Sequence, residues 1–383
     1  MKYRNIFFKM IGGMLLCACT IQPFSIRQGQ VLDLETAIRQ KKNLLLSDLS
    51  DSLQCIPLET NDSSLLGKRC FVLYADEQNI FVKSDYTVYR FNSDGRFLNK
   101  IGQHGNAPGE YNVAYSISVD QESQYLLYYV GQKKVQFWGY DGLFQKEIQL
   151  RSEGEITVVK MLNTDRLLAE KRSYSDDGLQ IYIELFDMEG NLLKQIPMNS
   201  DSQKVSLTMK TVPLMYTYGS LVKYKDINCN TLYSFDNDSE SRDWILNFGS
   251  YTPSRELLED VSQKETLLRD YVQLVDIQES DNTFYFLTIC DGRLRGIVVD
   301  KESGSLRYSQ AIGLPQMGGG IENDYIKDSC FWPSFISDSN VMYALLPVEK
   351  LTDAGALDMK RYLSHSTELT MEANPVVMKV YGK

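Results

Sequence analysis

The chain has 383 residues, of which 43% are hydrophobic, 11% aromatic and 23% charged, and this composition is too apolar for a disordered protein. A formal net charge of −10 argues against a nucleic-acid partner, which basic proteins bind through their Lys and Arg side chains. The length would allow two or three domains, but a closed all-β fold can use it as a single one.

The first residues have the pattern of a targeting segment. The first nine carry three positive charges and no acid, at Lys2, Arg4 and Lys9. An apolar run over residues 10–18 follows and is too short to span a bilayer. Its end, Leu16-Cys17-Ala18-Cys19, resembles a bacterial lipobox, which predicts a signal peptide over residues 1–18 and a lipid on Cys19. The alternative is ordinary secretion without a lipid.

Residues 19–50 are expected to form a lipidated tether and lead-in, and a repeat with a period near 48 residues follows. Its clearest copies are VYRFNSDGRFLNKI (88–101), VQFWGYDGLFQKEI (135–148) and IELFDMEGNLLKQI (183–196). Asp-Gly or Glu-Gly between alternating apolar runs predicts a hairpin, with turns at Gly95, Gly142 and Gly190. Two weaker copies occupy residues 232–246 and 297–312, the latter turning at Gly304.

Two further strand-like runs precede each hairpin, and four strands per 48 residues is typical of a β-propeller blade. A sixth blade can be assembled from residues 329–337, 341–348 and 375–381, with residues 53–58 as its fourth strand. Joining an N-terminal strand to the last blade closes the ring and removes two sheet edges. We therefore predict an all-β fold, a six-bladed β-propeller over residues 51–383 with an N- plus C-terminal closing blade.

Two segments interrupt the repeat. Residues 252–275 are predicted to be a helical insertion, because Thr252 suits the N-cap and Pro253 the first helical position. Residues 350–373 are predicted to be a second excursion, either helical or a loop.

The stretch IGQHGNAPGEY, from Ile101 to Tyr111, is a sharply shaped connection between the first two blades. Its glycines admit positive φ, and Pro-Gly favours a type II turn. A connection that crosses from the rim of a propeller to its axis is expected to help shape the mouth of the central channel. The loop residues near this mouth are Gly102, His104, Gly105, Pro108, Gly109 and Glu110.

Each chemically active residue in this loop has two interpretations. His104 is a candidate base or ligand, or a turn residue that faces solvent, and we favour the second. Glu110 is an acid at the channel mouth, or a carboxylate that accepts backbone N–H groups in a tight loop, which we prefer. Aromatic side chains at the mouth could stack on a sugar, although most are expected to pack between blades: Tyr86, Tyr89, Trp138, Tyr140, Tyr216, Tyr218 and Trp332.

Other chemistry has little support in the sequence. The chain has two histidines, without HxH or HExxH spacing, and it lacks GxSxG, P-loop and dinucleotide motifs, so no metal and no cofactor is expected.

Five cysteines beyond the lipobox are odd in number and far apart, at Cys55, Cys70, Cys229, Cys290 and Cys330. We expect small buried side chains, and one or two disulfides stay open as an alternative.

Several motifs together resemble the six-bladed β-propeller lipoproteins of Bacteroides and relatives, a family largely of unassigned function. They are the lipobox, IPLET (56–60), the glycine-rich loop, NTLYSF (230–235), FWP (331–333) and the terminal NPVVMKVYGK. Ala107 stands where the family often has Gly. The resemblance implies the fold and a place in the cell envelope, and no activity. The segment after Cys19 lacks the acidic run that accompanies export to the outer face in these bacteria, so we favour an anchor that faces the periplasm.

The sequence thus predicts an envelope-anchored lipoprotein that is a non-enzymatic binding or scaffold module for a glycan, a peptide or an envelope protein. One alternative is a hydrolase or lyase that acts on a glycan or peptide at the central channel, since fold does not decide function. Another is a structural subunit of an envelope complex.

Overall fold

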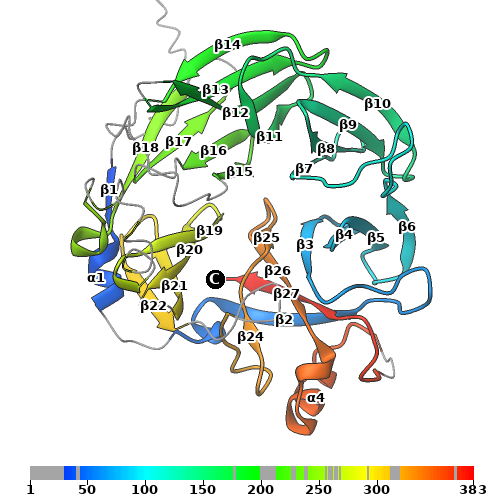
Figure 1. The fold of residues 1–383 in the computed structure, drawn as a ribbon. Coiled ribbons are helices and arrows are strands. Elements are labelled where there is room, and N and C mark those ends of the chain that lie inside the picture. Colours follow the sequence, from blue (N-terminus) through cyan, green and yellow to red (C-terminus); the bar gives the residue numbers. More distant parts are fainter. Residues whose placement is uncertain are drawn as a thin grey trace, which may run out of the picture.

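In the part of the chain that it describes, the computed structural model is a ring of six four-stranded antiparallel sheets around one axis (Figure 1), which confirms the predicted six-bladed propeller. The described residues are 30–39, 44–175, 178–198, 213–225, 230–236, 240–254, 257, 262, 266, 269–290, 293–310, 320–365 and 369–383.

The first three blades follow one another along the chain, each beginning with its innermost strand. Blade one consists of β3 (Cys70–Ala75), β4 (Asn79–Ser84), β5 (Thr87–Asn92) and β6 (Phe97–Ile101). Blade two consists of β7 (Ser116–Asp120), β8 (Tyr125–Gly131), β9 (Lys134–Gly139) and β10 (Phe144–Gln149). Blade three consists of β11 (Glu155–Asn163), β12 (Arg166–Ser175), β13 (Gly178–Asp187) and β14 (Leu192–Pro197).

The next two blades repeat the same order. Blade four consists of β15 (Leu214–Tyr218), β16 (Leu221–Lys225), β17 (Thr231–Phe235) and β18 (Glu240–Asn247). Blade five consists of β19 (Gln273–Glu279), β20 (Thr283–Cys290), β21 (Arg293–Asp300) and β22 (Leu306–Gln310).

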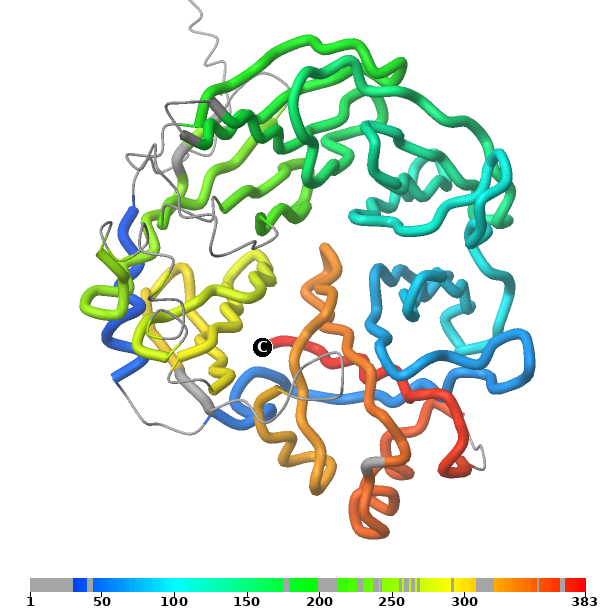
Figure 2. Tube along the Cα trace, viewed as in Figure 1, coloured from blue at the N-terminus to red at the C-terminus, as the bar shows by residue number. Residues whose placement is uncertain are grey.

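Blade six closes the ring with strands from the two ends of the described chain. It consists of β25 (Phe335–Ile336), β26 (Val341–Leu346), β27 (Val376–Gly382) and β2 (Ser50–Pro57). β2 lies antiparallel beside β27, and Figure 2 shows the N-terminal and C-terminal segments side by side. The predicted closing blade is confirmed, with one correction. Its first strand starts only at Phe335, because Cys330–Phe331 (β24) pairs with Ile321–Glu322 (β23) in a separate two-stranded sheet.

The turn glycine recurs in blades one, two and three because it lies where each blade meets the blade before it. Gly95, Gly142 and Gly190 have φ values of +84°, +84° and +82°, as hairpin turns require. A Cβ at these positions would lie 2.0, 2.3 and 2.3 Å from the carbonyl oxygens of Pro57, Lys100 and Gln149. Each of those carbonyls belongs to the outermost strand of the preceding blade. The glycine is therefore needed in every one of these three copies for neighbouring blades to approach.

The core lies in the wedges between neighbouring blades, and large aromatic side chains fill it because they bury the most area. One cluster joins Phe81 of blade one to Tyr128 and Trp138 of blade two. The same pattern continues around the ring with the fully buried rings of Phe137, Phe186, Tyr224, Phe235, Phe284, Phe286 and Phe331.

Part of the lead-in is folded onto the propeller, which the sequence did not predict. β1 (Gln30–Asp33) pairs in parallel with β18 and adds a fifth strand to blade four. The short helix α1 (Leu34–Arg39) buries Leu34, Ala37 and Ile38 in a cluster that contains Phe284 and Phe286 of blade five. A 3₁₀ turn, η1 (Leu46–Asp48), then leads into β2.

The two predicted excursions have different outcomes. Eleven of the 24 residues of the insertion over 252–275 lie outside the described residues, and its last three residues belong to β19 and are strand. It is preceded by the 3₁₀ turn η2 (Gly249–Tyr251). Within the second excursion, η5 (Val348–Lys350) precedes the helix α4 (Asp353–Lys360), whose N-cap is Thr352. No helix in the described ranges is long and apolar enough to cross a membrane.

Candidate functional site

The glycine-rich loop connects the outermost strand of blade one, β6, to the innermost strand of blade two, β7. The amide of Glu110 donates to the carbonyl of Ala107 at 2.9 Å, and Gly109 has a φ of +82°, as a type II Pro-Gly turn requires. The Glu110 carboxylate folds back and accepts the amide of Ala107 at 2.8 Å. A Cβ on Gly105 would lie 2.0 Å from that carboxylate, so only glycine leaves room for this contact.

Tyr111 anchors the loop to the core. Its ring is 3% exposed and meets the rings of Tyr128 and Trp138 edge-on, at centroid distances of 5.1 and 6.2 Å. Its hydroxyl donates to the carbonyl of Tyr86, in the turn between β4 and β5, at 2.8 Å. A Cβ on Gly102, which has a φ of +79°, would come within 2.7 Å of the Tyr111 ring. The loop therefore lies rigidly over the junction of blades one and two.

This anchor presents two rings to solvent. Tyr86 is 56% exposed, and its ring lies 5.2 Å from the imidazole of the exposed His104 at an interplanar angle of 34°. The imidazole also meets the buried ring of Tyr111 edge-on at 6.4 Å. We call Tyr86 and His104 the loop aromatic pair. The contacts of the loop lie along the two blades, where Gly109 faces the Phe144 ring of β10, and its contribution to the channel mouth stays a prediction.

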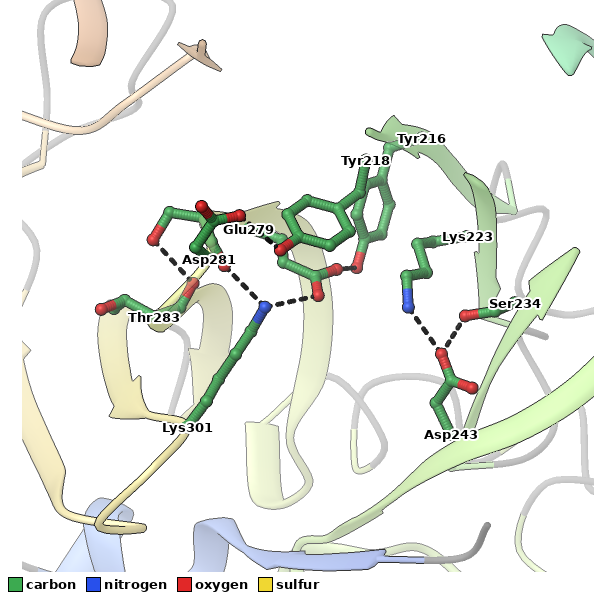
Figure 3. A network of polar contacts seen from close by, with 10 residues as sticks. Tyr216, Tyr218, Lys223, Ser234, Asp243, Glu279, Asp281, Thr283 and Lys301 are labelled. Carbon is green, nitrogen blue, oxygen red and sulfur yellow. Dashed lines mark hydrogen bonds and ion pairs between the residues drawn. The ribbon is translucent and has the colours of Figure 1, made fainter. Parts of the chain in front are cut away.

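A second cluster of polar side chains connects blades four and five (Figure 3). Tyr216 and Tyr218 of β15 point toward blade five, where the Tyr216 hydroxyl donates to Glu279 Oε2 at 2.7 Å. Lys301 Nζ donates to Glu279 Oε1 at 2.7 Å and lies 4.5 Å from the centroid of the Tyr218 ring. Glu279 is buried, and each of its oxygens has a protein donor.

The same cluster holds a second buried ion pair inside blade four. Lys223 Nζ lies 2.5 Å from Asp243 Oδ2, which also accepts the hydroxyl of Ser234. The Ser241 hydroxyl donates to the other oxygen, Oδ1, at 2.7 Å. Lys223 and Asp243 are both buried. Lys223 lies on β16 and Asp243 on β18, so the pair joins the second strand of blade four to its fourth. Breaking such a pair is costly because it leaves an uncompensated buried charge.

Burial controls the protonation of this cluster. Burial, followed by the nearby charge of Glu279, raises the pKa of Tyr216 well above its ordinary value. Burial and the bond to Asp281 raise the pKa of Tyr218. Burial lowers the pKa of Lys301, and the charge of Glu279 opposes that shift. The two phenols therefore remain protonated hydrogen-bond donors at neutral pH.

The other sequence-predicted residues fall mostly in the core. Tyr89, Trp138, Tyr140 and Trp332 are buried, as expected for packing between blades. The four described cysteines, Cys55, Cys70, Cys290 and Cys330, are buried, and burial raises the pKa of the Cys55 thiol to about 12. Cys19 and Cys229 lie outside the described residues. The described ranges contain no group of three or more His, Cys, Asp or Glu side chains that could hold a metal ion.

Sequence motifs pointed to Tyr216 and Tyr218 as aromatic candidates but missed their partners. Glu279 lies 63 residues from Tyr216 in the sequence, and no local pattern marks it or Lys301 as a partner. Only the alignment of β15 beside β19 in the ring brings these side chains together.

Comparison with models of known families shows which family the chain belongs to. A family model described as "Domain of unknown function (DUF4934)" matches residues 29–381. The chain belongs to the DUF4934 family. The matched range includes β1, all six blades and the loop aromatic pair, and the description of the family gives no activity. A comparison with curated proteins found no match.

Solved structures share the fold of this DUF4934 protein. One is a Bacteroides fragilis protein described as a "Putative exported protein", with 18% identity and a TM-score of 0.72 over 92% of this chain and 100% of that chain. Another is a member of the duf4221 family from Bacteroides vulgatus, with 9% identity and a TM-score of 0.50 over 87% of this chain and 97% of that chain. At these identities the likeness shows the propeller fold alone.

Proposed function

We propose that this DUF4934 protein is a non-enzymatic binding protein of the bacterial envelope, which meets a glycan or peptide ligand at the loop aromatic pair. The observation that carries the proposal is the exposed ring of Tyr86, which lies beside the His104 imidazole. The carbonyl of Tyr86 is fixed by the hydroxyl of the buried Tyr111. An exposed aromatic ring on a rigid turn can stack on a ligand with little loss of side-chain entropy on binding.

The buried carboxylates of blades four and five also favour binding over catalysis. A hydrolase or lyase would need an acid and a base free to exchange protons with a substrate. Glu279 and Asp243 instead have a protein donor on each oxygen. Their bonds support a rigid scaffold.

Location in the envelope rests on the N-terminus. The positive start, the short apolar run and the lipobox ending at Cys19 are the features of a lipoprotein signal peptide. The fold shared with a Bacteroides fragilis protein described as exported agrees with this location. We propose that a lipid on Cys19 anchors the protein and that the propeller faces the periplasm. Mass spectrometry of the membrane fraction should find the lipid on Cys19, and a Cys19→Ala variant should not be anchored.

The binding proposal is tested with glycan and peptide arrays, probed with the parent protein and with Tyr86→Ala. We expect Tyr86→Ala to lose about tenfold in affinity for whichever ligand the parent binds, since stacking on one aromatic ring contributes on the order of 1 kcal/mol or more. Tyr125→Ala is the matched control, because Tyr125 is another exposed tyrosine at the opposite end of blade two. Equal losses for the two variants, or no binding by the parent at high concentration, would contradict the proposal.

A further inference from the structure

Aspartates lie in or next to the first turn of several blades, on the face opposite the glycine-rich loop. Blades repeat around one axis, so the turn between the first two strands of every blade lies on the same face. We call it the first-turn face. Asp76 lies between β3 and β4, at the start of the first turn of blade one, and the corresponding residues of blades two, five and six are Asp120, Asp281 and Asp338.

A row of aromatic rings runs beneath these aspartates from blade two to blade six. The ring of Tyr140 lies 4.7 Å from that of Phe81, which lies 6.2 Å from Tyr74. Tyr74, on the innermost strand of blade one, continues the row to Phe335 of blade six at 5.1 Å. The charges of Asp76, Asp120 and Asp338 contribute to the raised pKa of Tyr74 or Tyr140, so these three acids lie near the aromatic row.

One hydroxyl in this row lacks a partner. Tyr140 is 5% exposed, and its hydroxyl has no hydrogen bond to any group in the described ranges. Burial raises the pKa of Tyr140, and the next largest contributions come from Tyr74, Asp76 and Asp120, so the phenol faces these residues. A buried hydroxyl without a partner is unfavourable, and it calls for a group that comes from outside the chain.

The aspartates keep acceptor capacity for such a group. Asp76 Oδ1 accepts the amides of Gln78 and Asn79 at 2.8 and 2.7 Å, which closes the turn, while Oδ2 has only a long contact of 3.4 Å to the Asn79 amide group. Asp120 likewise uses Oδ1 for the amide of Ser123 at 3.1 Å. The second oxygen of each carboxylate is thus open to a donor.

Two cations near this face, Arg90 and Lys301, already have partners. Arg90 lies 5.2 Å from the centroid of the Tyr140 ring, but its guanidinium donates to Asn79 Oδ1 at 2.8 Å and to the Tyr140 carbonyl at 3.0 Å. Lys301 is paired with Glu279. Neither of these two cations therefore pairs with the open oxygens of Asp76 and Asp120.

We propose that the first-turn face binds a cationic group, an ammonium or a guanidinium, between the carboxylates of Asp76 and Asp120 and the aromatic row of Tyr74 and Tyr140. Aromatic rings attract cations through their quadrupole, and charge-assisted hydrogen bonds to carboxylates add strength and direction. This site is separate from the loop aromatic pair, and the ligand would be a lysine- or arginine-bearing peptide.

The test is calorimetric titration of the full chain in a neutral detergent with tetralysine amide. The fully acetylated peptide, which has the same length without the charges, is the comparison. We expect binding of the charged peptide only, weakened by salt, and a loss of about tenfold in affinity for Asp76→Asn, because one charge-assisted bond is removed. Asparagine can still accept the two turn amides, so the turn is retained.

Two further variants test whether binding of the charged peptide depends on this site or only on the negative charge of the protein. Asp62→Asn removes the same charge at an exposed position in the loop after β2 and should leave the affinity unchanged. Tyr140→Phe should weaken binding about threefold without lowering the melting temperature, since its hydroxyl has no partner to lose in the described ranges. Equal affinities for Asp76→Asn, Asp62→Asn and the parent, or equal binding of the acetylated peptide, would overturn the proposal. Tyr86→Ala should bind tetralysine amide as tightly as the parent does. The proposal for this site and the proposal for the loop aromatic pair can therefore be contradicted independently.

Discussion

At the scale of residues, two similar hydrogen bonds near the axis differ in whether water could replace the donor if it were removed. Tyr216 and Tyr218 lie on one strand and donate to Glu279 and Asp281 at similar distances of 2.7 and 2.8 Å. Glu279 is buried and Asp281 is exposed. Water can replace a lost donor at Asp281, whereas Glu279 would keep an unpaired oxygen in the interior.

Tyr216→Phe should therefore destabilise the protein by about 1–3 kcal/mol, while its matched control Tyr218→Phe should cost less than about 0.5 kcal/mol. Urea unfolding followed by fluorescence measures the two free energies of unfolding. Equal costs would show that burial of Glu279 does not control the strength of this contact.

Lys160 gives a prediction about pH. It lies on β11, its Nζ donates to the carbonyl of Ile117 at 2.9 Å, and burial lowers its pKa from 10.5 to about 8. Between these two values the unfolded chain holds a proton that the native protein has released. The free energy of unfolding of the parent should therefore rise, relative to that of Lys160→Met, as pH increases from about 8 toward 10.5. We expect a relative gain of about 2 kcal/mol in denaturant unfolding across this window. A difference between the two proteins that stays constant with pH would contradict it.

At the scale of elements, the hairpin between the last two strands of a blade carries the contact to the blade before it. The Asp-Gly or Glu-Gly pattern was sufficient to predict the hairpins at Gly95, Gly142 and Gly190, because such turns require a residue that accepts a positive φ, which glycine does. It could not show that the glycine also meets the preceding blade, since that contact depends on the curvature of the ring. Gly304 in blade five differs, because it has a φ of +65° but no atom of the described residues within 4 Å of the place that a Cβ would take.

Gly95 and Gly304 make a matched pair of variants. Gly304→Ala should cost about 1 kcal/mol, for the positive φ alone. Gly95→Ala adds a clash with the Pro57 carbonyl, 2.0 Å from the new Cβ, and should cost about 3 kcal/mol or more. Thermal unfolding of the two variants compares them, and equal melting temperatures would refute the role of Gly95 in packing the blades.

At the scale of the whole molecule, the sequence predicted the blades and their closure because the repeat and the terminal strand-like runs are local patterns. It did not predict β1, because the four residues Gln30–Asp33 have no turn signal, and their parallel partner β18 lies about two hundred positions away in the chain. The same limit applies to the candidate site. Glycines and Pro-Gly marked the loop, whereas the contact between the rings of His104 and Tyr86 depends on how two neighbouring blades meet.

Closure of the ring by β2 should be essential for stability. Ile56 lies opposite Val377 and is buried between blades six and one. Ile56→Asp places a charge there and should cost roughly 4 kcal/mol, whereas Ser52→Asp, at an exposed position on the same strand, should cost less than about 0.5 kcal/mol. Limited proteolysis should cut Ile56→Asp faster within blade one. Resistance equal to that of Ser52→Asp would mean that the ring holds without this strand.

The central claim is that the loop aromatic pair is a ligand-binding surface. Amide hydrogen exchange of the full chain, with and without the glycan or peptide selected on the arrays, tests it most directly. We predict slower exchange on ligand addition in residues 84–88 and 103–113, which carry Tyr86 and His104, and unchanged exchange in blade four. Protection confined to other segments, with these two unchanged, would contradict the claim.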